Sequence, residues 1–111
     1  MSDPTPLPTH PVVSLDDTVH QRVRLGVLAI LHDVAKADFG YLRDGLGLTD
    51  GNLSRHLQVL ETAGFVAVEK GYEGRRPRTW VRATKPGRKA FEAEVAALRE
   101  LLDGVGGGPA S

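Results

Sequence analysis

Apolar residues recur every three or four positions between residues 19 and 34, which is the period of one buried helical face. The series comprises Val19, Val23, Val27, Ile30, Leu31 and Val34. Ser14 precedes it as a candidate N-cap, and Asp16 and Asp17 would lie in the first turn, where the helix dipole favours acids. A bend near Gln21 would divide the segment, so we expect one or two helices here.

A second, short helix is expected at residues 38–44. Phe39 and Leu42 would face inward from it, and Gly45 and Gly47 punctuate its end. A short helix followed by a tight turn is one half of a helix-turn-helix, provided that a longer helix comes next.

The next helix carries strong signals at both ends. Thr49 is a good N-cap, and Leu48 and Leu53 occupy the two positions of a hydrophobic staple. Gly64 suits the left-handed position that terminates a helix, so we expect a helix from Asp50 to Ala63. Its inward stripe is Leu53, Leu57 and Leu60.

The C-terminal part of the chain predicts a hairpin and a long helix. Residues 65–72 and 79–84 read as two strands, and the basic stretch between them reads as their loop. Thr84 can cap the final helix, with Pro86 tolerated in its first turn. Along that helix, a coiled-coil-like seam with 4-3-4 spacing is formed by Phe91, Val95, Leu98 and Leu102.

The predicted order is three helices, two strands and a helix. This is a mostly α fold with a two-stranded β-hairpin wing (α+β), the winged helix-turn-helix. The domain would span residues 14–103. Residues 1–13 contain four prolines and read as a disordered arm, and residues 104–111 read as a flexible glycine-rich tail.

The composition narrows the function. A chain of 111 residues points to one domain, and the absence of cysteine excludes disulfides and thiolate metal sites. No apolar run could span a bilayer and no secretory signal is visible, so we expect a cytoplasmic protein. The acids form no catalytic arrangement, and His20 and His32, twelve residues apart, could form a metal pair, but lone histidines on helices are more often structural. We therefore expect no enzyme, no cofactor and no metal.

Charge is distributed unevenly in a chain that is neutral overall. Residues 70–89 contain eight basic residues and one acid, a local net charge of +7. Such a field attracts anionic partners, although a solvated basic loop would have the same composition. Three arginines, Arg75, Arg76 and Arg78, occupy the predicted wing loop and could reach phosphates or a minor groove. Lys70 and Arg82 flank them.

The outer face of the third predicted helix offers the side chains of a DNA major-groove reader. Arginine pairs with guanine, asparagine and glutamine pair with adenine, and serine adapts to base or phosphate. The candidates are Asn52, Ser54, Arg55 and Gln58. An ordinary polar helix face is the alternative, but no acid interrupts residues 51–58. We expect His56 to pack or to touch a phosphate, and Trp80 to fill the core.

Two stretches resemble winged-helix regulators of bacteria and archaea near the MarR and ArsR groups. They are Leu53-Ser-Arg-His-Leu-Gln-Val-Leu-Glu-Thr-Ala-Gly-Phe-Val66 and Gly74-Arg-Arg-Pro-Arg-Thr-Trp80. The resemblance implies a homodimeric transcriptional regulator that binds double-stranded DNA through the helix and wing residues named above. It also implies dimerisation through the terminal helices, for which the seam on the last helix is the candidate. The missing cysteines separate this chain from metal-sensing ArsR proteins.

These observations lead to one hypothesis and one alternative. The hypothesis is a homodimeric regulator on a palindromic operator, with a recognition helix in each major groove. The alternative is a winged helix used for protein–protein contact, in which the seam binds a different chain. It also stays open that the seam packs only on its own domain. Neither the operator nor an effector ligand can be read from the sequence.

Overall fold

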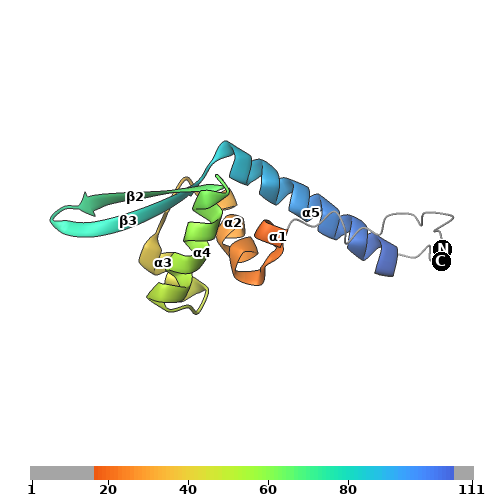
Figure 1. Ribbon diagram of the computed structural model, residues 1–111, viewed down its shortest axis with the longest axis horizontal. Coiled ribbons are helices and arrows are strands. Elements are labelled where there is room, and N and C mark those ends of the chain that lie inside the picture. The colour runs from red at the N-terminus through yellow and green to blue at the C-terminus, as the bar shows by residue number, and fades with distance from the viewer. Residues whose placement is uncertain (1–16, 107–111) are drawn as a thin grey trace, which may run out of the picture.

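The computed structural model describes residues 17–106, which form five helices and three strands (Figure 1). The helices pack into a body at the base of a β-hairpin. The hairpin and the last helix project from opposite sides of this body. The expected arm at residues 1–13, the Ser14 cap and the tail beyond Gly106 lie outside the described residues.

The first apolar stripe is divided between two helices. α1 spans Asp17–His20 and α2 spans Arg22–Asp33. Between them Gln21 has a non-helical backbone (φ −57°, ψ 132°), and its Oε1 accepts hydrogen bonds from the N–H groups of Val23 (2.8 Å) and Arg24 (3.1 Å). The predicted bend therefore occurs at a residue that caps the second helix.

A short strand that the sequence did not predict connects α2 with the helix-turn-helix. β1 consists of Ala37–Asp38 and pairs antiparallel with the hairpin strand β3 (Arg76–Ala83), with Ala37 opposite Val81. Asp38 is also the N-cap of α3 (Phe39–Gly45), because its Oδ2 accepts a hydrogen bond from the Tyr41 N–H at 3.2 Å. One residue thus joins the sheet to the first helix of the helix-turn-helix.

The helix α4, which the sequence predicts to be the recognition helix, spans Asp50–Thr62, within one residue of the predicted limits. Thr49 caps it by accepting a backbone hydrogen bond at 3.2 Å. At the other end Gly64 has a φ of 82°, and the Phe65 N–H bonds to the Leu60 carbonyl at 2.9 Å. This is the Schellman termination that Gly64 predicts.

The wing is longer and its turn is tighter than the sequence suggested. β2 spans Val66–Glu73, and its antiparallel pairing with β3 continues to Glu73 opposite Arg76. Only Gly74 and Arg75 remain as the turn, and Gly74 has a φ of 66°. A positive φ at the first turn position alone fits a type II′ hairpin. The strand order β1-β3-β2 completes a three-stranded antiparallel sheet.

The last helix, α5, spans Lys85–Gly106, three residues beyond the expected domain boundary. Thr84 caps it: its Oγ1 accepts a hydrogen bond from the Gly87 N–H (3.0 Å) and donates one to the Gly64 carbonyl (2.6 Å). The cap therefore ties the start of α5 to the end of α4. No helix among residues 17–106 combines the length and apolarity needed to cross a membrane.

One core unites the helices with the base of the wing. Its fully buried members come from α1, α2, α3, α4 and β3, and include Val19, Leu28, Leu31, Leu42, Leu53, Leu60 and Val81. The stripes predicted for the first and third helical segments supply most of it. Because α4 and the sheet share this core, the recognition helix has a fixed position relative to the wing.

Candidate nucleic-acid interface

The predicted base-reading side chains lie on the exposed side of α4. Asn52, Ser54, Arg55 and Gln58 are all exposed, whereas Leu53, Leu57 and Leu60 are buried. At about 100° per residue, Arg55 and Gln58 point most directly away from the core, while Ser54 and Asn52 lie on opposite flanks. The four side chains therefore lie on one exposed surface but point in different directions around the helix axis.

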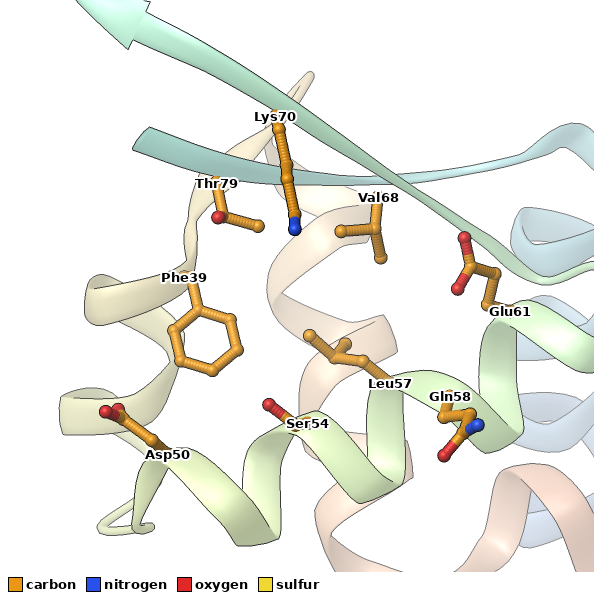
Figure 2. Close-up of a pocket in the computed structure, with 9 residues that line it drawn as sticks. All are labelled: Phe39, Asp50, Ser54, Leu57, Gln58, Glu61, Val68, Lys70 and Thr79. Atoms are coloured by element: carbon orange, nitrogen blue, oxygen red, sulfur yellow. The ribbon is translucent and has the colours of Figure 1, made fainter. Parts of the chain in front are cut away.

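Shallow depressions border α4 on both sides. On the wing side a crevice of about 390 Å³ lies between α3, α4 and β2, as Figure 2 shows. On the other side a depression of about 460 Å³ extends toward α1. Gln58 lines both. The exposed face of the helix is therefore open to an elongated partner, with a shallow depression along each edge.

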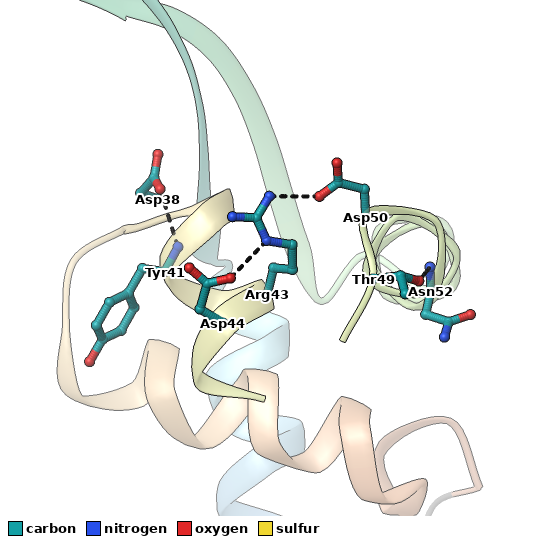
Figure 3. Close-up of polar contacts among 7 residues, drawn as sticks. All are labelled: Asp38, Tyr41, Arg43, Asp44, Thr49, Asp50 and Asn52. Atoms are coloured by element: carbon teal, nitrogen blue, oxygen red, sulfur yellow. Dashed lines mark hydrogen bonds and ion pairs between the residues drawn. The ribbon is translucent and has the colours of Figure 1, made fainter. Parts of the chain in front are cut away.

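Arg43 links the two helices of the helix-turn-helix. Its Nη1 donates a hydrogen bond to Asp50 at 2.8 Å, and its Nε donates one to Asp44 at 2.9 Å (Figure 3). The hydrogen bond to Asp44, followed by that to Asp50, raises the pKa of Arg43, and Arg43 in turn lowers the pKa of Asp44. This link is not visible in the sequence, because no local periodicity connects positions seven apart across a turn.

The wing has two chemically different faces. The inner face, which packs on the helices at its base, carries Val66, Val68, Lys70 and Tyr72 on β2 and Pro77, Thr79, Val81 and Ala83 on β3. The outer face carries Ala67, Glu69, Gly71 and Glu73 on β2 and Arg76, Arg78, Trp80 and Arg82 on β3. Most wing arginines therefore lie on the face opposite the recognition helix.

Internal ion pairs occupy much of the outer face. Arg78 contacts Asp38 at 3.2 Å and Glu73 at 2.9 Å, and Arg82 contacts Glu69 at 2.9 Å. The hydrogen bond to Asp38 is the main reason why the pKa of Arg78 is raised. The structure thus places Arg78, a predicted DNA contact, in a network that fastens the wing to the N-terminus of α3.

Trp80 is half-buried on the same outer face. The Lys36 Nζ lies 4.6 Å from the centre of the indole ring, a cation–π arrangement. The ring therefore packs against the protein itself, although outside the main core.

Arg75 and Arg76 are the arginines that the wing leaves available. Arg75 lies in the two-residue turn and Arg76 begins β3, and both are exposed. Within residues 17–106 neither side chain forms an ion pair. Their position at the end of a projecting hairpin gives them the longest reach of any basic side chain on the wing.

Arg88 belongs to a different part of the molecule despite its place in the basic stretch. From the first turns of α5 it donates hydrogen bonds to the carbonyls of His32 (3.1 Å) and Val34 (3.4 Å), at the C-terminus of α2. It therefore satisfies carbonyls that a helix end leaves without partners. The local charge counted over residues 70–89 overstates the charge of the wing.

His56 lies on the flank of α4, half-buried. Burial is the main reason why its pKa is lowered, and the positive charges of Arg24 and Arg55 lower it further. The neutral ring is therefore favoured, which fits packing better than the phosphate contact that was the other expectation for this residue.

The seam predicted on α5 divides into two parts. Phe91, Val95 and Leu98 are partly buried, and Phe91 packs against the core and against the His32 ring. Leu102 is 65% exposed, and Val105, one turn later, is 76% exposed. The first part fastens α5 to α2, and the second part presents apolar side chains on a projecting helix.

Known proteins share this architecture. Residues 23–102 match the family model described as winged helix DNA-binding domain. An uncharacterized protein of Methanocaldococcus jannaschii is 39% identical over 83 residues, covering 75% of this chain and 90% of that protein. The structure of a transcriptional regulator homologue from Pyrococcus horikoshii is 34% identical, with a TM-score of 0.77 over 82% of this chain and 90% of that one. A PadR family transcriptional regulator from Eggerthella lenta is 26% identical, with a TM-score of 0.61 over 86% and 90%. The fold, with its helix-turn-helix and wing, agrees with these matches. The chain therefore belongs to the family of winged helix DNA-binding domains.

Proposed function

We propose that this protein is a sequence-specific transcriptional regulator that acts as a homodimer on a palindromic operator. The shape of α4 carries the proposal. Its crest, the exposed face opposite the buried apolar stripe, carries Arg55 and Gln58, and both side chains also line the depression on the α1 side. Arg55 and Gln58 would read base edges in the major groove, with Asn52 and Ser54 beside them.

The wing would supply contacts that do not depend on sequence. Arg75 and Arg76 would bind phosphates or enter the adjacent minor groove. Arg78 would act through the wing, because its guanidinium already binds Asp38 and Glu73. Arg78 would therefore position the wing, whereas the sequence predicted that it contacts DNA directly.

The exposed part of α5 supports the homodimer. Leu102 and Val105 present apolar surface at the end of the helix that lies farthest from the wing. Two copies that pair along the exposed part of the predicted seam, at Leu102 and Val105, would bury it, while Phe91, Val95 and Leu98 hold α5 against its own domain. The two recognition helices would then meet half-sites about 34–36 Å apart, one turn of DNA.

Selection of binding sequences from a random DNA pool tests the proposal, with the mass of the purified protein measured in the same buffer. We expect an enriched palindrome bound by a dimer, and binding that weakens steeply between about 50 and 200 mM salt. A monomer that enriches no sequence and ignores DNA at low salt would instead support a protein-binding winged helix.

A further inference from the structure

Lys70 and Tyr72 project from the inner face of the wing, on the side of the recognition helix. Lys70 lies opposite Thr79 and Tyr72 opposite Pro77, and both are exposed, Tyr72 by 73%. In Figure 2 the amino group of Lys70 points from β2 into the crevice between the wing and α4. Neither residue belongs to the cluster Arg75, Arg76 and Arg78, from which the sequence predicted the DNA contacts of the wing.

The crevice combines hydrogen-bond donors with an apolar floor. Lys70, Ser54 and Thr79 bring an ammonium group and two hydroxyls to it, and the floor includes Phe39 and Leu57. A phosphodiester with its sugar has the matching character, because anionic oxygens alternate with an apolar ring along the strand.

Two carboxylates border the crevice, in different situations. Asp50 lies at the beginning of α4 and is bound by Arg43 at 2.8 Å. Glu61 lies near the other end of α4 and is exposed, and no ion pair to it is found within residues 17–106. The wing arginines on the outer face cannot offset Glu61, because they lie across the sheet and two of them are paired.

We propose that one backbone strand of the operator passes between α4 and the inner face of the wing. Lys70 and Ser54 bind one phosphate from its two sides, and the ring of Tyr72 packs on a neighbouring deoxyribose farther along the wing. The inference rests on the proposed function and deepens it, since it assigns Ser54 to the backbone and adds two contacts. It also makes Glu61 a residue that opposes binding.

The Lys70→Gln variant tests the phosphate contact, with Lys89→Gln as a control. Lys89 is exposed on α5, so both variants lose one positive charge but only Lys70 faces the crevice. We expect Lys70→Gln to weaken operator binding by about fivefold and to reduce the salt slope by about 0.9, the value for one phosphate, while Lys89→Gln does neither. Ethylation of one operator phosphate should weaken binding of the wild type more than that of Lys70→Gln, which keeps only the Ser54 contact to that phosphate.

A gain of affinity provides a second test that a folding defect cannot imitate. We expect Glu61→Gln to tighten binding about two- to fivefold, and Glu100→Gln, an exposed carboxylate on α5, to leave it unchanged. Tyr72→Ala should weaken binding, whereas Tyr72→Phe, which keeps the ring, should retain it.

The outcomes separate this inference from the function on which it rests. A wild-type protein that binds no DNA overturns the proposed function. A wild-type protein that selects an operator, with Lys70→Gln equal to Lys89→Gln and Glu61→Gln equal to Glu100→Gln, leaves the function standing and overturns the path of the strand.

Discussion

Gly87 occupies a position where no side chain fits. A Cβ placed there would overlap the backbone carbonyl of Phe65, whereas one placed at Gly104, also in α5, would meet open space. We expect Gly87→Ala to lower the free energy of unfolding by more than about 2 kcal/mol, because backbone atoms must move. Gly104→Ala should raise it by up to about 1 kcal/mol through helix propensity. Urea denaturation of both variants measures the difference, and equal stabilities would contradict the close contact.

His56 makes a residue-scale contribution to the pH dependence of stability. Its folded-state pKa lies below the ordinary value of 6.5, so the stabilisation is present above that pH and is lost as the pH falls toward the lowered value. Unfolding of the wild type and of His56→Gln between pH 7.5 and 5 should show a smaller loss for the variant. A loss that is larger in the variant would reverse the sign and refute the assignment.

Arg55 and Arg76 should differ in what they contribute to DNA binding. Arg55 lies on the crest of α4, so Arg55→Ala should cost about 1–3 kcal/mol on the operator and relax preference at one base pair. Arg76 lies on the wing, so Arg76→Ala should weaken all sequences alike and lower the salt slope by about one. Titrations with operator and random DNA distinguish them. If both variants lost the same affinity for operator DNA and for random DNA, the two arginines would not have different roles.

At the scale of elements, the sequence predicted those whose signals are local. The cap at Thr49, the stripe of α4 and the terminating Gly64 lie within one element, so their spacing is visible in the chain. β1 consists of two residues and exists because β3 pairs with it. Cross-strand pairing likewise extends β3 through Arg76 and Pro77, which by composition belong to a loop. Pairing between distant segments leaves no periodicity to read.

The same limit applies to the candidate site. The exposed residues of α4 were identified because a helical wheel separates them from the core. The partners of Arg78 and Arg43 were not, because each pairs with a carboxylate on another element. The sequence thus located the charged groups, and only the fold determines which of them are already neutralised.

Asp38 lets the wing and the helix-turn-helix be tested as coupled elements. Asparagine can still cap α3, but the Asp38→Asn variant loses the charge that binds Arg78. We expect amide hydrogen exchange in β3 to accelerate, with exchange in α4 unchanged, and stability to fall by about 1 kcal/mol. Unaltered exchange in β3 would mean that the backbone pairing alone holds the wing.

At the scale of the whole molecule, the proposed dimer would depend on the far part of α5. Leu102→Glu places a charge on the proposed seam, whereas Ala93→Glu places one on the opposite side of the same helix. We expect Leu102→Glu to be a folded monomer that binds a half-site normally and the full palindrome weakly, while Ala93→Glu remains dimeric. Sedimentation and titration test this, and a dimeric Leu102→Glu would place the interface elsewhere.

The joint at Thr84 has a consequence for how such a protein could change its target. Thr84 bonds to Gly64, and Gly87 packs on Phe65, so α4, the wing and the root of α5 form one block. In the proposed dimer each subunit would be one such block, so the distance between the two recognition helices would depend on where the two α5 helices cross. Sliding that crossing by one helical turn moves it about 5.4 Å, more than the 3.4 Å rise of one base pair. Substitutions at the end of α5 remote from the wing would then select operators with a longer or shorter spacer, while the bases read in each half-site stayed the same.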